Sequence, residues 1–245
     1  MPINKLSVLV NLYKKEMRQL SLDIAFTLGA VLVSVIIIIT SDKSPAAVLP
    51  FIMVAGLAGL IPVVSSIRIL SGEWNNNTIY LMLSLPIKGQ MVLGAKLLAL
   101  ITHYIIGTGT VIISSILLMF FWIPDFTAII TSRFGYVPWD WFLGVYILTV
   151  ALFVFIASLS FLAQVLGHLF SRFTGWAITI IFIFLWWLIS KFNHWMGNFF
   201  SVWQFDFEPA MTAANLLSWS IFGTLVEALI VFAIAVIVYN RKIEI

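Results

Sequence analysis

The chain has 245 residues, of which 62% are hydrophobic and only 9% are charged, and its formal net charge is +3. A soluble globular domain carries about 25% charged residues, and no single soluble core could bury this much apolar surface. The composition therefore excludes an ordinary soluble domain and predicts the lipid bilayer as partner. The small net charge gives no argument for nucleic acid binding, and the absence of cysteine excludes disulfides and thiolate metal sites.

Residues 1–22 do not have the pattern of a secretory signal, because charges are spread through them and no short apolar core precedes a small-residue cleavage site. Apolar residues instead recur at helical spacing, while Lys14, Lys15 and Arg18 face elsewhere. This pattern predicts an amphipathic helix at the cytoplasmic interface. A solvated basic tail is the alternative.

Six segments are apolar and long enough to cross a bilayer, which takes about 20 residues in a helix. They predict an all-α integral membrane protein with one transmembrane domain over residues 1–245. The predicted spans are residues 23–40, 46–70, 91–121, 141–169, 175–190 and 219–239. The outer stretch 191–218 is rich in Trp and Phe, and we expect short helices there that dip into the outer leaflet.

The distribution of basic residues predicts the orientation. With the N-terminus inside, ten of the 13 Lys and Arg residues fall on the inner side of the six spans. Short loops rich in Lys and Arg stay in the cytoplasm. We therefore expect a multi-pass protein of the cell membrane with both termini in the cytoplasm.

Nucleotide and catalytic motifs are missing from the sequence. A phosphate-binding loop needs G-x-x-x-x-G-K-[ST], and the nearest fragment, residues 94–96, lacks the earlier glycine. The zinc motif H-E-x-x-H and the nucleophile motif G-x-S-x-G are also missing. We expect no enzyme activity, no metal site and no cofactor in this chain.

Three polar residues lie inside the predicted spans. Glu227 lies near the middle of the last one, where a carboxylate should face protein or water rather than lipid. It could be a substrate or proton site, or form an interhelical bond with His103, Gln164 or Arg68. The alternative is a protonated or hydrogen-bonded structural residue. His103 and Gln164 themselves fit better as polar residues that hold membrane helices together.

The inner connection over residues 71–90 interrupts the apolar pattern. Arg68 just before it, Glu73 and three Asn precede a short amphipathic stretch, and Pro86 ends this stretch because proline disfavours helix in the residue before it. A short helix flanked by Glu73 and Lys88 suits docking onto another protein. An ordinary helix–loop–helix turn with interfacial charges fits these residues equally well.

The same connection resembles the permease subunits of type-2 ATP-binding-cassette (ABC) transporters. The residues that carry the resemblance are Glu73, Asn77-Thr78, the leucine-rich stretch to Leu85-Pro86, and 92–96 with Lys96. Asn77 stands where glycine is usual in that family. The layout is also similar, with an N-terminal elbow helix, six spans, both ends inside and a long outer segment before the sixth span.

The resemblance implies two permease subunits, identical or different, and a separate cytoplasmic ATPase on each that binds ATP and Mg. The connection would be the coupling helix and residues 1–22, with Lys14, Lys15 and Arg18, the elbow. The residues expected to couple to the ATPase are Glu73, Trp74, Thr78, Leu81, Met82, Leu85, Pro86 and Lys88.

The expected function is export of a hydrophobic or amphipathic substrate, such as a peptide or a drug. By resemblance, exporters of this shape move such cargo, and the outer loops here are small. The alternative is a proton-coupled secondary transporter that uses Glu227 and needs no ATPase. A membrane enzyme or scaffold would need catalytic residues clustered at one membrane level, and the sequence shows no such cluster.

Overall fold

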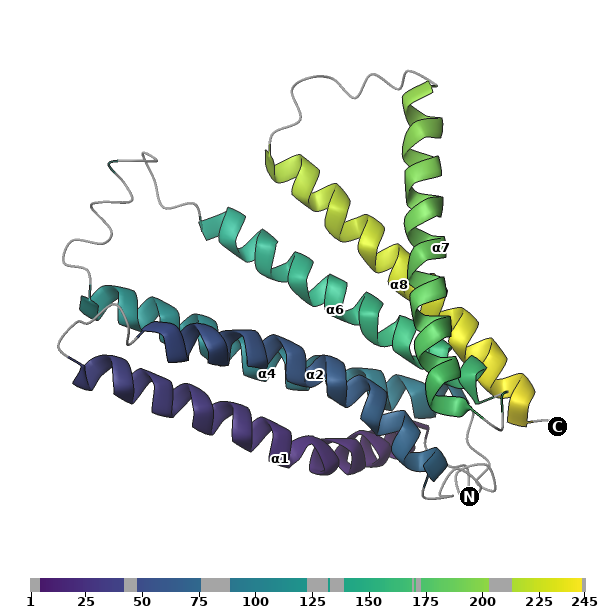
Figure 1. Cartoon of the computed structure of the whole chain (residues 1–245), viewed down its shortest axis with the longest axis horizontal. Helices are drawn as coiled ribbons and strands as arrows, with labels where there is room; N and C mark the ends of the chain where they lie inside the picture. Colours follow the sequence, from purple (N-terminus) through teal and green to yellow (C-terminus); the bar gives the residue numbers. More distant parts are fainter. Residues whose placement is uncertain are drawn as a thin grey trace. The chain divides into compact units, whose positions relative to one another are not determined.

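The computed structural model describes residues 5–41, 48–75, 89–122, 132, 139–168, 170, 173–202 and 213–243 (Figure 1). Within these residues the chain is helical and contains no strand. Six of the described helices are long and apolar enough to cross a membrane. This confirms the prediction of an all-α, multi-pass membrane protein.

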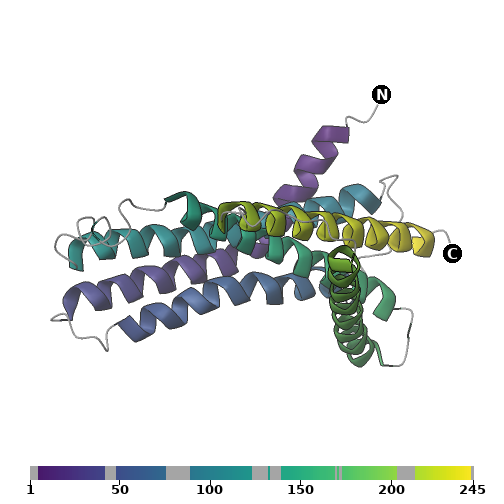
Figure 2. The same ribbon diagram turned by 90° about the horizontal axis from the view of Figure 1, so that it is seen from above.

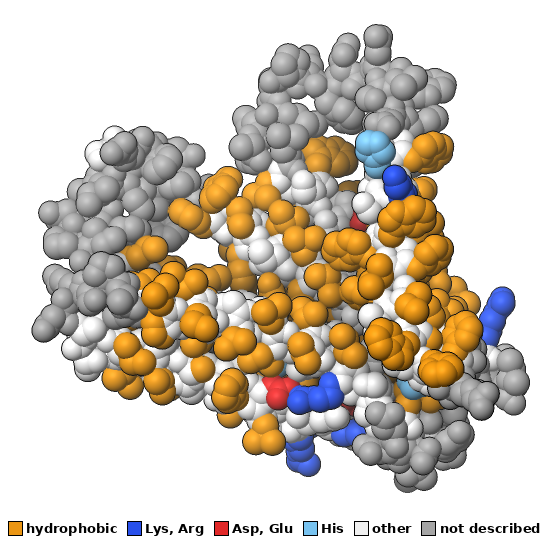
Figure 3. All heavy atoms as spheres, viewed as in Figure 1, with side chains coloured by type: hydrophobic (Ala, Val, Ile, Leu, Met, Phe, Trp, Pro, Cys, Tyr) orange, Lys and Arg blue, Asp and Glu red, His pale blue; other side chains and the backbone are white. Residues whose placement is uncertain are grey.

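The described helices coincide with the predicted spans and extend several of them. They are α1 (Lys5–Thr40), α2 (Val48–Asn75), α4 (Gly89–Trp122), α6 (Trp139–Gly167), α7 (Thr174–Val202) and α8 (Ala213–Ile243). Beyond its predicted span, α7 continues to Val202 through part of the predicted outer stretch. Apolar side chains cover most of the face shown in Figure 3, and charged side chains are few.

The predicted elbow and the first span form one continuous helix, α1. Figure 2 shows that its N-terminal part points in a different direction from the rest of α1. Lys14, Lys15 and Arg18 are exposed on this part, whereas Glu16 and Leu20 are buried. The helix is therefore two-sided, as the pattern predicts, and its position at the membrane interface stays a prediction.

The chain forms two compact units, and the first contains Met1–Ile69 and Met91–Leu143. Its core joins α1, α2 and α4. Val31 and Ile38 of α1, Phe51 and Ala58 of α2, and Val111 of α4 are all buried in one apolar cluster. Side chains spaced along one face of each helix thus hold the three helices together.

The second unit contains Leu70–Gln90 and Gly144–Ile245. Its helix α6 carries almost fully buried side chains such as Phe153, Leu159 and Phe161. No residue is buried in the most apolar window of α7, Thr174–Trp195, and Figure 1 shows α7 at a steep angle to α6 and α8. So much exposed apolar surface is stable against lipid or another protein, not against water.

The junction of α6 and α7 depends on a close backbone approach at Gly167. A Cβ there would lie 3.0 Å from the backbone N and 3.1 Å from the Cα of Ile178. Gly175, in the first turn of α7, has no such neighbour within 4 Å.

We expect Gly167→Ala to lower the free energy of unfolding by about 1–3 kcal/mol, because backbone atoms cannot move aside as a flexible side chain can. Gly175→Ala is the matched control and should raise stability by about 0.5–1 kcal/mol, the gain for alanine over glycine in a helix. Thermal denaturation in maltoside micelles measures both. Equal effects of the two substitutions would contradict the close packing at Gly167.

Candidate functional site

The structure describes both ends of the connection predicted to dock onto another protein. Glu73 and Trp74 lie in the last turn of α2, which ends at Asn75. The connection resumes with Gly89, the first residue of α4. The other residues expected to couple lie outside the described residues, namely Thr78, Leu81, Met82, Leu85, Pro86 and Lys88.

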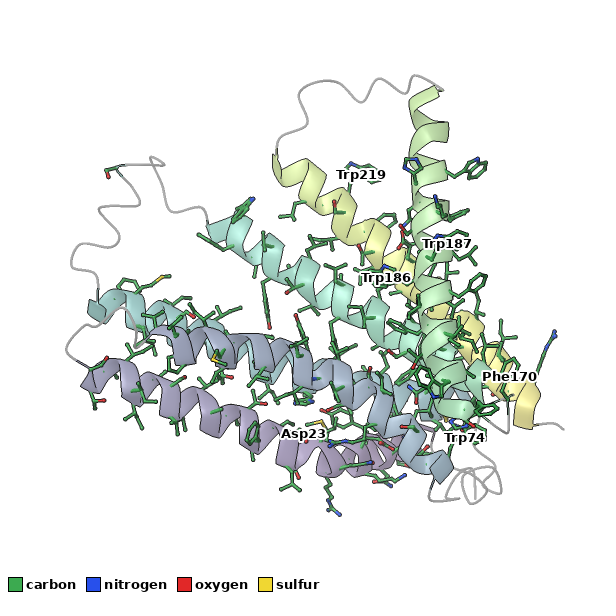
Figure 4. All side chains as sticks on the ribbon, viewed as in Figure 1. Asp23, Trp74, Phe170, Trp186, Trp187 and Trp219 are labelled. Carbon is green, nitrogen blue, oxygen red and sulfur yellow. The ribbon has the colours of Figure 1, made fainter. Side chains whose placement is uncertain are left out.

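The end of α2 is attached to the end of α6 by an aromatic stack. The Trp74 and His168 rings lie 4.3 Å apart between centroids, with 16° between their planes, and Figure 4 labels Trp74 at the end of α2. His168 directly follows α6, and its backbone N–H donates to the Gln164 carbonyl at 3.0 Å. Glu73, beside Trp74, is only 5% exposed.

The start of α4 lies against the last turns of α8. A Cβ on Gly89 would lie 2.6 Å from Cδ1 of Tyr239 and closer still to Oδ1 of Asn240. Tyr239 is itself buried, so its ring has little space to move away. Both ends of the connection therefore pack on the same unit, one on α6 and the other on α8.

A buried ion pair joins α1 to α4. The Lys96 ammonium donates to Oε1 of Glu16 at 3.0 Å and to the Ile69 carbonyl at 3.4 Å. Lys96 and Glu16 are 0% and 1% exposed, so water screens their attraction little. Lys15 lies 3.6 Å from the same carboxylate oxygen but is half exposed. The pair fixes the predicted elbow segment on the helix that follows the connection.

A second ion pair joins α1 to α2. Arg68 of α2 forms an ion pair with Asp23 of α1, and the Ser65 hydroxyl donates to the same carboxylate oxygen at 2.9 Å. Arg68 is thus held by Asp23, which the sequence did not identify as its partner.

His103 is fully buried in α4, and neither of its ring nitrogens has a hydrogen-bond partner in the part of the chain that the structure describes.

Glu227 lines a cavity of the second unit. The cavity has a volume of about 310 Å³ and is lined by residues of α6, α7 and α8. Ser190, Asn193 and Thr224 give it polar groups, and the remaining lining is apolar. Gln164, also predicted as a polar candidate, is instead fully buried in α6, and its amide donates to the Ser160 carbonyl of the preceding turn.

Among the described residues, no group of three or more His, Asp and Glu side chains could hold a metal ion. No protein-family model, no curated protein and no solved structure matches this chain. The functional proposal therefore rests on the arrangement of the residues described above.

The sequence reasoning missed Glu16, Asp23 and Asn193. Glu16 lies between Tyr13 and Leu20, three and four residues away, so it belongs to the buried face of the amphipathic helix. A carboxylate on such a face needs a cation, and this signal could have identified it. Asn193 had no comparable signal, because the sequence placed it in an outer connection.

We expect Lys96→Met to lower the free energy of unfolding by about 3–5 kcal/mol, because it leaves the Glu16 carboxylate buried without its closest cation. The double variant Glu16→Leu with Lys96→Met should recover most of this loss, since it buries no charge. Lys15→Met, which removes the exposed neighbour, is the control. Denaturation in micelles gives the coupling energy, and a double variant as unstable as Lys96→Met would contradict the pair.

Proposed function

We propose that this chain is the membrane-spanning permease subunit of an ABC exporter. A separate cytoplasmic ATPase would bind and hydrolyse ATP, and this chain would carry the substrate path. The observation that carries the proposal is the anchoring of the two described ends that flank the connection resembling a coupling helix. Trp74 before it packs on the end of α6, and Gly89 after it packs on the end of α8.

This anchoring supports coupling because a helix transmits displacement along its axis. His168 lies 13 residues after Phe155, and Tyr239 lies 12 residues after Glu227, which is roughly 20 Å in each case at 1.5 Å per residue. Phe155 and Glu227 both line the cavity of the second unit. A partner that pushes on the connection would therefore move two walls of that cavity.

The buried pair of Glu16 and Lys96 supports the same proposal. It ties the elbow segment to α4 within the first two turns after the connection. Closure of the ATPase dimer on ATP would then displace the elbow and the connection together. In this proposal the N-terminus and C-terminus face the cytoplasm, and a second permease subunit completes the transporter in the cell membrane.

The cavity supports a hydrophobic or amphipathic substrate. It combines apolar walls with one carboxylate and a few neutral polar groups, which suits a ligand with an apolar body better than a sugar or a nucleotide. A secondary transporter that uses Glu227 would have the same cavity, but it would not need anchored ends on the connection.

Affinity purification of the tagged chain from its own cells should bring down an ATPase that has the phosphate-binding loop this chain lacks. Replacing Leu81 and Leu85 by Ser should reduce the co-purified ATPase by about tenfold or more, because docking helices bind through apolar side chains. Leu6→Ser, at a 73% exposed position of α1, should leave it unchanged. Mass spectrometry and ATPase assays of the eluate measure both.

The purified chain alone, reconstituted in liposomes, should show no transport on a proton gradient. Transport under those conditions, or no ATPase in the eluate of the unmodified chain, would contradict the proposal.

Gly89→Ala should separate docking from coupling. The substitution displaces the start of α4 from Tyr239 but leaves residues 76–88 unchanged, so the ATPase should still co-purify while substrate-stimulated ATP hydrolysis falls by several-fold. Gly94→Ala, in the same helix with no atom within 4 Å, should keep both. Stimulation that survives Gly89→Ala would show that the packing of Gly89 on α8 does not transmit the signal.

A further inference from the structure

The cavity of the second unit contains a carboxylate without a counter-ion. Glu227 forms no hydrogen bond or ion pair within the described residues, and it belongs to the candidate span Leu217–Arg241. A carboxylate at membrane depth is costly unless a partner compensates it. Lys191, which follows Ser190 on α7, does not line the cavity. Among the described residues of this unit, no cation compensates the carboxylate, so a bound cation would supply the charge that it lacks.

Part of the cavity lining is aromatic. Phe155 of α6 and Trp186 of α7 both line the cavity, with ring centroids 6.0 Å apart and planes inclined by 53°. Figure 4 labels Trp186 on α7. Phe155 is buried and Trp186 is about half exposed, so a ligand can contact the indole face. Aromatic faces attract cations through the ring quadrupole, and tryptophan does so best.

The remaining lining restricts the ligand further. Leu152 and Ile189 are apolar, while Ser190, Asn193 and Thr224 are neutral. None of the described lining residues is Lys or Arg, so this lining offers no cation to compensate an anionic ligand. A volume of about 310 Å³ lies at the lower end for small-molecule sites, which fits one compact ligand.

We infer that this cavity binds a lipophilic monovalent cation, an ammonium-type or delocalised charge on an apolar body. Glu227 compensates the charge, Trp186 and Phe155 contact the apolar body, and Asn193 donates to any polar group beside it. The inference deepens the proposed function, on which it rests for the role of the ligand as cargo. Binding itself requires no ATPase.

Binding of tetraphenylphosphonium to the purified full chain in maltoside micelles tests the inference. We expect saturable binding that Glu227→Gln weakens by about tenfold, because the variant keeps the shape and removes the charge. Trp186→Leu should weaken it several-fold. Trp187→Leu, which changes the neighbouring tryptophan outside the cavity, should not. Thermal denaturation of each variant shows that it is folded.

Tetraphenylborate has the same shape and the opposite charge, and we expect no saturable binding of it. Equal binding of both ions, unchanged affinity in Glu227→Gln, or equal losses in the two tryptophan variants would overturn the inference, since each indicates partition into apolar surface. None of these outcomes changes whether an ATPase co-purifies with the chain. The inference can therefore fail while the proposed function still holds.

The cation could be carried by a free molecule or by a lipid headgroup. Adding phosphatidylethanolamine to the micelles distinguishes the two sources. If the lipid displaces tetraphenylphosphonium from the unmodified chain but not from Glu227→Gln, the site binds an amine-bearing lipid. If the lipid displaces none, the site binds a free lipophilic cation.

Discussion

The cost of placing charge among apolar helices determines much of this structure. In the first unit this cost is met inside the chain, because Lys96 pairs with Glu16 and Arg68 pairs with Asp23. Each pair joins α1 to another helix, so each also fixes which faces of the helices meet. A buried pair such as Lys96 and Glu16 adds little net stability compared with apolar packing, but removing one member leaves a buried charge. Such a pair therefore specifies the arrangement more than it strengthens it.

In the second unit the charge of Glu227 is not compensated, because this residue has no partner among the described residues. The two units therefore differ in whether their carboxylates can interact with a ligand. A carboxylate that is already paired cannot respond to a ligand, whereas an unpaired one in a cavity can gain a partner when the ligand binds. The paired charges hold helices, and the unpaired one offers a binding site.

The spans could be predicted from the sequence because they depend only on length and hydropathy, and the bilayer imposes both. The partners of the polar residues could not, because helical spacing gives the face of a side chain but not the helix opposite it. Lys96 was recognised from its place in a motif, yet its bond to Glu16 crosses 80 positions of the chain. Trp74 and His168 meet in the same way, through the close approach of the ends of α2 and α6.

The exposure of α7 bears on what surrounds the cavity. Ser190 and Asn193 line the cavity and are exposed on a helix whose other exposed residues are largely apolar, such as Trp187 and Ile183. Lipid would leave the amide of Asn193 without a hydrogen-bond partner, at a cost of several kcal/mol in an apolar medium, about 4–8 by transfer scales. The side of α7 that carries Asn193 should therefore face water, a ligand or a second subunit. The apolar side of the same helix has no such requirement, and lipid suffices there. In the proposed exporter, the side of α7 that carries Asn193 would face the substrate path.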